Sequence, residues 1–206
     1  MNLKKIPSNR IRKLRTLSLG KEEYTFCDLK HSPSIELIDL CSNDYFGLSR
    51  DIDIINAAYN LTLKEGLGSG SSRFISGSRP IHELLEKKLS EWLNQEKVLL
   101  FPSGFQANIA AIQTLADRNS IIIADRLIHN SLLVGAQTSG SKLIRFLHND
   151  LNDLEKKLLK FTSQKKSILV VVESLYSMEG SIAPIKEISE ICKRYGVKLL
   201  VDEAHS

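Results

Sequence analysis

The strongest constraint on the fold is an alternation in the C-terminal half of the chain, where short apolar runs are separated by helix-length amphipathic segments. The apolar runs predict strands at residues 98–101, 120–125, 142–147, 167–173 and 197–202. The segments between them predict helices at residues 104–116, 130–138, 151–161 and 185–195. Such a regular alternation implies an α/β fold, in which helices cover both faces of a mainly parallel sheet.

Two further helices are predicted before this region. Asp51 lies at the N-cap position of a helix that ends at Glu65, and Gly66 follows as its stop signal. Pro80 opens a second helix at the favoured first position, and that helix has one apolar face. Glycine and serine dominate residues 66–79 between the two helices, and they predict a loop with unusual backbone freedom.

The first fifty residues are less regular. Residues 10–19 predict a short amphipathic helix and residues 36–40 a short strand. Residues 1–21 contain arginine and lysine but no acid, which fits either a basic surface helix or an organellar transit peptide. We favour the surface helix, because the segment continues into the next without a flexible break. We expect residues 1–50 to form a helix-and-strand segment and residues 51–206 to form a large α/β domain.

Composition limits the kind of protein that this chain can be. Its 206 residues are 42% hydrophobic and 25% charged, which supplies enough apolar material for one substantial core. The net charge of +4 is smaller than the excess of a dedicated nucleic-acid-binding protein. Three separate cysteines favour a reduced, cytoplasmic protein, and no apolar run approaches the length of a membrane span. We therefore expect a cytoplasmic protein without a nucleic-acid or membrane partner.

Polar side chains collect where the last two predicted strands end. Glu173 and Ser177 follow one strand, and Asp202 and His205 follow the next. Ligands of open α/β sheets bind at the carboxyl ends of the strands, so these four residues could line one crevice. Asp202 ends an apolar run, where a charge without a partner would be costly.

Two other junctions lie at predicted strand ends. In residues 101–108, F-P-S-G-F-Q-A-N, the first amides of a helix lie near Gly104 and Phe105 and could bind an anion such as phosphate. A plain turn capped by Ser103 explains the same residues. His129 follows the next strand, where a single histidine is more often a packed or capping residue than a functional one.

Two stretches imitate known nucleotide-binding motifs. Residues 136–143 and 201–205 suggest the phosphate loop and acid pair of a DEAH-type, nucleic-acid-dependent ATPase. However, Ser141 precedes Lys142, and the loop follows a helix and precedes a strand, which reverses the required order. The glycines of residues 66–70 follow a helix and lack the G-x-G-x-x-G spacing of a dinucleotide site. The sequence contains no G-x-S-x-G nucleophile elbow and no zinc-ligand spacing.

Seven short blocks occur in an order that is specific to one family. They are S-N-D-Y-F-G-L-S, G-S-G-S-S-R-F-I-S-G, I-H-E-L-L-E, F-P-S-G-F-Q-A-N, D-R-L-I-H-N-S, L-Y-S-M-E-G-S-I-A-P and L-L-V-D-E-A-H-S. Together they resemble the α-oxoamine synthases, acyltransferases that depend on pyridoxal 5'-phosphate (PLP) and have the aspartate-aminotransferase fold (fold type I). The resemblance covers nearly the whole chain from Arg10 onward.

The resemblance implies how several residues would hold this cofactor. Gly104 and Phe105 match the residues that hold the cofactor phosphate. His129 matches the catalytic histidine that stacks on the pyridine ring and can reach the substrate carboxylate. Asp202 matches the aspartate on the pyridine nitrogen. A carboxylate there keeps the nitrogen protonated, so that the ring can accept electrons from a carbanion.

Four further positions match polar contacts of the family. Ser177 and His205 match contacts to the cofactor, and His205 would be directed at its phenolic oxygen. Asn43 falls where the family places a residue near the amino-acid substrate. Arg15 matches an arginine that contacts the acyl donor, in a region where the family varies.

The blocks are most similar to those of family members that act in biotin biosynthesis. The implied reaction is the decarboxylative condensation of L-alanine with a pimeloyl thioester, pimeloyl-CoA or pimeloyl carrier protein, to 8-amino-7-oxononanoate. Members that use glycine or serine with another acyl-CoA share most blocks and form one alternative. Dimers of the family build their sites from two chains, so we expect a homodimer when the protein is complete. A non-catalytic partner subunit is a second alternative.

The lysine that binds the cofactor covalently in this family lies on a later strand, beyond Ser206. Lys142 and Lys198 cannot replace it, because each lies at the start of its strand and the cofactor lies at the strand ends. The resemblance therefore implies that residues 51–206 are an incomplete cofactor-binding domain without the small C-terminal domain. It also implies that this chain is inactive alone.

Overall fold

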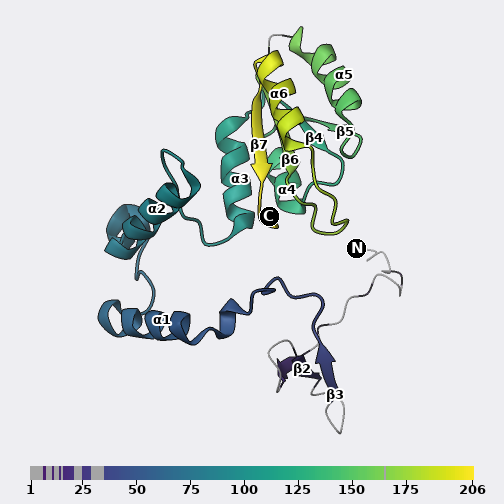
Figure 1. The fold of residues 1–206 in the computed structure, drawn as a ribbon. Coiled ribbons are helices and arrows are strands. Elements are labelled where there is room, and N and C mark those ends of the chain that lie inside the picture. The colour runs from purple at the N-terminus through teal and green to yellow at the C-terminus, as the bar shows by residue number, and fades with distance from the viewer. Residues whose placement is uncertain are drawn as a thin grey trace, which may run out of the picture. The chain divides into compact units, whose positions relative to one another are not determined.

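The computed structural model describes residues 7, 11, 14, 16–20, 25–28, 35–164 and 166–206. The chain divides into two compact units, residues 1–79 and 80–206, and each is described by itself (Figure 1). The division that we expect from the sequence, at residue 50, stays a prediction.

The first unit contains a small antiparallel sheet. Its strands are β1 (Leu17–Leu19), β2 (Thr25–Asp28) and β3 (Ile35–Ile38), in the order β1-β2-β3. Strand β3 confirms the strand predicted at residues 36–40, although it ends two residues earlier than predicted. The helix predicted at residues 10–19 is wrong at residues 17–19. There the sequence Leu-Ser-Leu alternates with a period of two, and its backbone pairs with β2, so the partner strand decides the local structure.

The same unit contains the first predicted long helix, α1 (Ile52–Glu65). Asp51 is its N-cap: Oδ1 accepts hydrogen bonds from the amides of Asp53 at 2.9 Å and Ile54 at 3.0 Å. The helix ends at Glu65 and is followed by the C-cap Gly66, whose φ of 80° favours glycine. The predicted start, cap and stop are all confirmed. A short 3-10 helix, η2 (Leu48–Arg50), precedes α1.

The glycine- and serine-rich loop after α1 contains one turn of π-helix, η3 (Arg73–Gly77). Gly77 has a packing reason to be glycine, because a Cβ built on it would lie 1.8 Å from the carbonyl oxygen of Ser71. The loop prediction for residues 66–79 therefore holds except for this one ordered turn.

The second unit contains a four-stranded sheet in which every pairing is parallel (Figure 1). The strands are β4 (Ile121–Asp125), β5 (Lys142–Phe146), β6 (Ile168–Glu173) and β7 (Lys198–Asp202), in the order β5-β4-β6-β7. These four strands and the parallel sheet confirm the predicted α/β fold.

The strand predicted at residues 98–101 is wrong. Among the described residues, no strand pairs with it. The amide of Leu100 instead donates to Glu86 Oε1 at 3.0 Å, and Glu86 belongs to helix α2 (Pro80–Leu93). An apolar run becomes a strand only where a neighbouring strand takes up its backbone hydrogen bonds, and local sequence does not reveal that neighbour.

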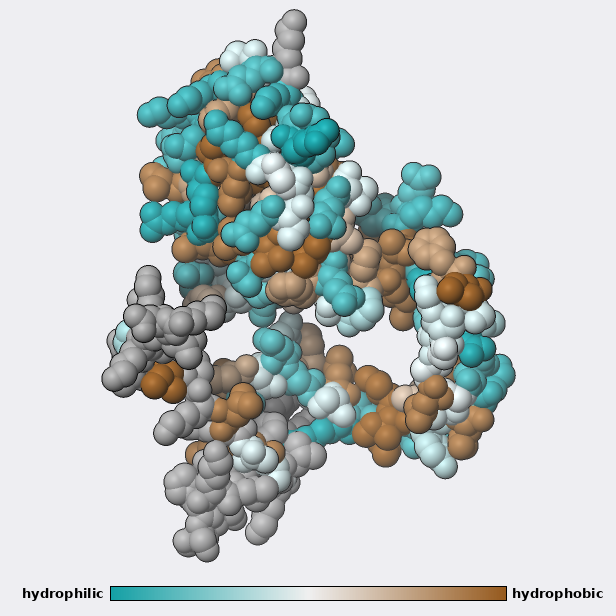
Figure 2. Space-filling view, turned by 180° about the vertical axis from the view of Figure 1, so that it is seen from behind, coloured by the Kyte–Doolittle hydropathy of each residue, from teal (hydrophilic) through white to brown (hydrophobic). Residues whose placement is uncertain are grey.

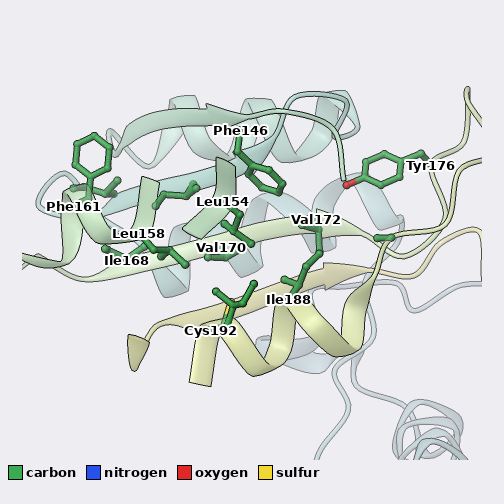
Figure 3. Close-up of a cluster of buried hydrophobic side chains, with 14 residues drawn as sticks. Phe146, Leu154, Leu158, Phe161, Ile168, Val170, Val172, Tyr176, Ile188 and Cys192 are labelled. Atoms are coloured by element: carbon green, nitrogen blue, oxygen red, sulfur yellow. The ribbon is translucent and has the colours of Figure 1, made fainter. Parts of the chain in front are cut away.

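Four helices cover the sheet, and their positions match the predictions. They are α3 (Gly104–Leu115), α4 (Asn130–Thr138), α5 (Leu151–Thr162) and α6 (Ile185–Tyr195). Helices α5 and α6 enclose one apolar core against the sheet, and Figure 3 shows its side chains converging between these elements. Helices α3 and α4 enclose a second core on the other face. The sheet is therefore buried on both sides, as its near-continuous apolar strands predict.

The alternation of side chains along a strand assigns each strand end to one face. In β6, Val170 and Val172 belong to the α5/α6 core and Val171 to the α3/α4 core, so Glu173 projects on the α3/α4 face. In β4, Ile123 belongs to the α5/α6 core, so Asp125 projects on that face. The two acids therefore end neighbouring strands but serve opposite faces.

Candidate functional site

A cavity of about 140 Å³ lies at the carboxyl ends of the strands in the second unit. It is lined by Gly104, Phe105, Asn108, His129, Ser131, Glu173, Asp202, Ala204 and His205. Five of the six residues for which the family resemblance implies cofactor contacts lie in this lining. Chain segments that are far apart in sequence thus meet at one sheet edge, as open α/β folds arrange their binding sites.

The N-terminus of α3 forms one wall of the cavity. Ser103 caps this helix by accepting a hydrogen bond from the Gln106 amide at 3.2 Å. Gly104 and Phe105 occupy the first turn, where backbone amides have no partner within the helix. A Cβ added to Gly104 would meet no atom within 4 Å, so the space beside this turn is open. An anion can therefore approach these amides directly.

His129 forms the N-cap of α4. Its Nδ1 accepts a hydrogen bond from the Ser131 amide at 3.2 Å and lies 2.7 Å from Ser131 Oγ. A nitrogen that accepts from a backbone amide carries no proton, so neutral His129 carries its proton on Nε2. These contacts fix the plane of the imidazole at the cavity wall.

Two residues that the sequence analysis did not single out connect His129 to Asp202. Asn108 Nδ2 donates to Asp202 Oδ2 at 2.7 Å and to Ser131 Oγ at 2.9 Å. Ser131 is fully buried and lies against the His129 ring. The signal for Asn108 was present in the sequence, because it follows Gly104 by four residues and so shares its helix face.

Glu173 and Asp202 form a pair of acids at the base of the cavity. They are register partners on β6 and β7, so their side chains project on the same face of the sheet. Asp202 Oδ1 also accepts from the Ala204 amide at 2.9 Å, which gives this carboxylate two N–H donors. Glu173 is 4% exposed, and its Oε1 accepts from the His129 amide. Burial, reinforced by the negative charge of Asp202, raises the pKa of Glu173 above its ordinary value, although the amide of His129 opposes this shift.

The remaining predicted site residues have different positions. His205 lines the cavity. Ser177 is exposed in the turn that follows β6 and is not among the lining residues. Asn43 is exposed in the first unit, and Arg15 lies outside the described residues. The functional roles of all these residues remain predictions.

A second polar cluster, built on the buried Asp125, lies on the α5/α6 face of the same sheet. Asp125 is 0% exposed, and its carboxylate accepts from the amides of Leu127 at 2.8 Å and Asn149 at 2.9 Å. His148 Nδ1 lies 3.0 Å from Asp125 Oδ1, and its Nε2 lies 2.7 Å from Ser181 Oγ. Tyr176 packs edge-on against the His148 ring, with centroids 4.5 Å apart. The burial of Tyr176 and the charge of Asp125 raise the pKa of the phenol.

Within the described part of the chain, no group of three or more His, Cys, Asp or Glu side chains is arranged to hold a metal ion. The described helices are all too short or too polar to cross a membrane.

Several known proteins are similar to this chain. The Aminotransferase class I and II family matches residues 35–206. The putative 8-amino-7-oxononanoate synthase of Acetivibrio thermocellus is 35% identical over 195 residues, which are 95% of this chain and 48% of that protein. The 8-amino-7-oxononanoate synthase of Salmonella paratyphi B is 45% identical over 170 residues, 82% of this chain and 44% of that protein.

Solved structures give the same result. A PLP-bound serine palmitoyltransferase from S. paucimobilis superposes with a TM-score of 0.87 at 32% identity, covering 94% of this chain and 47% of that chain. The 8-amino-7-oxononanoate synthase of Francisella tularensis superposes with a TM-score of 0.66 at 30% identity, covering 80% and 44%. The chain thus spans about half the length of the relatives that it matches. It belongs to the aminotransferase class I and II family, and its relatives confirm the resemblance to the α-oxoamine synthases.

Proposed function

We propose that this chain supplies the PLP-binding cavity of an α-oxoamine synthase that condenses L-alanine with a pimeloyl thioester to 8-amino-7-oxononanoate. The observation that carries the proposal is the hydrogen-bonded connection from Asp202 through Asn108 and Ser131 to His129, at the wall of a cavity that also receives a helix N-terminus. An acid for the ring nitrogen, an imidazole beside the ring and an anion-binding turn for the phosphate suit three parts of this cofactor.

The residues of the cavity fit PLP by their chemistry. The open first turn of α3, at Gly104 and Phe105, would hold its phosphate. Asp202, whose two carboxylate oxygens each accept one N–H donor, would lie at the pyridine nitrogen and hold a proton there. When bound, the cofactor supplies an electron-accepting ring for a carbanion next to the amino-acid nitrogen.

His129 would hold the ring plane. Its Nδ1 is fixed by Ser131, so Nε2 is the nitrogen left to face a ligand. Ser177 and His205 would add polar contacts, and Asn43 and Arg15 would lie toward the substrates. The family's covalent lysine matches no residue of this chain, so we expect the chain to bind the cofactor without covalent attachment and to lack turnover by itself.

The choice of substrates follows the curated relatives. Those that are 35–45% identical are named 8-amino-7-oxononanoate synthases, which favours L-alanine with pimeloyl-CoA or pimeloyl carrier protein in a cytoplasmic enzyme. The alternative, glycine or serine with another acyl-CoA, rests on the TM-score of 0.87 to a serine palmitoyltransferase.

The surfaces of two helices favour a homodimer of the complete protein. Neither α1 nor α2 has a buried residue, and each exposes large apolar side chains such as Tyr59 and Trp92. Figure 2 shows hydrophobic side chains, in brown, on the surface of these helices. Apolar faces of this kind are usually covered by a partner or by further chain.

The experiment that tests the proposed function is equilibrium binding of pyridoxamine 5'-phosphate to this chain. This probe has no aldehyde and cannot react with surface lysines. We expect saturable binding that Asp202→Asn weakens about tenfold or more, because a charge-assisted hydrogen bond is lost. Absence of saturable binding to the wild-type chain would overturn the proposal. In the complete protein, assays with L-alanine, glycine and serine, each with pimeloyl-CoA, palmitoyl-CoA or acetyl-CoA, decide between the two substrate classes.

A further inference from the structure

Glu173 is a buried acid in the cavity for which the family resemblance assigned no role. It is 4% exposed, lines the cavity, and is the register partner of Asp202. Its position is thus set by the sheet and not by a loop. A carboxyl group buried this deeply needs either a compensating partner or a proton.

The charge balance of the cavity does not supply a compensating cation. Its lining contains the two acids, His129 and His205, but neither lysine nor arginine. Two neighbouring carboxylates without a fixed cation do not both ionise easily, because each charge disfavours the other.

The hydrogen bonds distinguish the two acids. Asp202 receives N–H donors on both oxygens, from Asn108 and from the Ala204 amide. Among the described residues, Glu173 receives one donor, the main-chain amide of His129, on Oε1. Donors stabilise the charged form of a carboxylate, so the smaller number of donors on Glu173 favours placing the proton there.

We propose that Glu173 is a proton-carrying positioning residue, which holds the His129 amide through one carboxyl oxygen while Asp202 alone carries the negative charge of the pair. This inference rests on the proposed function and deepens it. The His129 amide begins the turn that places the imidazole, so Glu173 would act on the ligand through His129. The groups that face Glu173 are His129 before α4, and Asp202 and His205 at the end of β7. Burial raises the pKa of Glu173, which agrees with the neutral form.

The test compares two substitutions that separate charge from hydrogen bonding. Glu173→Gln keeps an acceptor oxygen for the His129 amide and has no charge, so it imitates the proposed state. Glu173→Ala removes the acceptor. We expect Glu173→Ala to weaken binding of pyridoxamine 5'-phosphate about fivefold to tenfold, and Glu173→Gln to restore most of that loss.

A second measurement does not depend on the cofactor. Carbon-13 NMR of glutamate side chains in the unliganded wild-type chain, with Glu173→Gln identifying the signal, reports the protonation of Glu173 directly. We expect this carboxyl group to titrate above the other glutamates of the chain.

Each outcome decides between the ideas. If the wild-type chain does not bind the probe, the proposed function fails, while the NMR titration still tests the proton on Glu173. If the wild-type chain binds but Glu173→Gln loses as much affinity as Glu173→Ala, the charge is needed and the inference is wrong. A Glu173 signal that titrates with or below the exposed glutamates also overturns it. Restored binding with a raised titration supports it.

Discussion

Two polar clusters lie at the carboxyl ends of strands of the same sheet, one on each face. They share the residue types aspartate, histidine and serine but have different roles. The cavity array consists of Asn108, His129, Ser131, Glu173 and Asp202. The closed array consists of Asp125, His148 and Ser181. In the closed array, the histidine lies within hydrogen-bond distance of both the aspartate and the serine. In the cavity array, Asn108 links the aspartate to the serine, and the serine lies within hydrogen-bond distance of the histidine.

The two arrays differ in whether both ring nitrogens of the histidine have a partner in the protein. In the closed array, both ring nitrogens of His148 lie against protein oxygens, and the Asp125 carboxylate is occupied by two backbone amides and the ring. In the cavity array, only Nδ1 of His129 has a hydrogen-bond partner among the described residues, and the array faces a cavity. Residue type therefore does not separate a structural cluster from a binding site, whereas unsatisfied groups that face open space do.

The largest expected effect is a difference in the free energy of unfolding between variants of the two aspartates. Asp125→Ala leaves the amides of Leu127 and Asn149 and the His148 ring without the buried carboxylate that they contact, and we expect it to lower the free energy of unfolding by about 3 kcal/mol or more. Asp202→Ala should cost only about 1 kcal/mol, because its donors lie at the cavity edge. Urea unfolding followed by circular dichroism measures both. Equal losses would break the distinction between the arrays.

Substitution of His148 should mainly affect stability, whereas substitution of His129 should mainly affect binding. We expect His148→Ala to lower the free energy of unfolding by about 2 kcal/mol, through lost hydrogen bonds and the lost contact with Tyr176. His129→Ala loses an N-cap that contributes about 1 kcal/mol, yet it should weaken binding of pyridoxamine 5'-phosphate about tenfold. Unfolding and binding should be measured on both variants. The account is contradicted if His148→Ala impairs binding more than His129→Ala.

The serines give a finer comparison, because both changes remove one hydroxyl. Ser181→Ala should lower the free energy of unfolding by about 1 kcal/mol and leave binding unchanged. Ser131→Ala interrupts the connection between Asn108 and His129, so we expect about threefold weaker binding in addition to a similar loss of stability. Isothermal titration of the probe resolves this difference. Equal binding by the two variants would argue against a role for the connection.

The smallest effect is a dependence on pH. The folded chain raises the pKa of Glu173, so it favours the protonated form more than the unfolded chain does. The stability contributed by Glu173 is therefore complete below the ordinary glutamate pKa and is lost as the pH rises through the raised value. Glu173→Gln removes this loss, and its stability relative to wild type should increase with pH. Unfolding at several pH values tests the trend, and a constant difference or a decrease would contradict it.

Much of this arrangement follows from sequence patterns alone. The apolar runs place Glu173 and Asp202 at strand ends, and the cap and stop residues of α1 fix its limits. Parallel pairing then requires these strand ends to meet at one edge. The sequence does not show that Glu173 and Asp202 lie side by side, because this depends on the register of β6 against β7, which the structure gives.

Other features depend on partners that local sequence does not reveal. The run at residues 98–101 has strand-like residues but no paired strand among the described residues, and residues 17–19 become a strand because β2 lies beside them. The closed array joins Asp125, His148 and Ser181 from three separate segments, so no spacing in the sequence predicts it. Tertiary contacts decide each of these cases.

The central claim is that the cavity array binds the cofactor while the closed array holds the fold. The most direct test is the affinity of pyridoxamine 5'-phosphate for the wild-type chain, Asp202→Asn and Ser181→Ala, measured side by side by isothermal titration. The account predicts saturable binding that Asp202→Asn weakens about tenfold or more and that Ser181→Ala leaves unchanged. Binding that is absent in the wild-type chain, or is insensitive to Asp202→Asn, would contradict it.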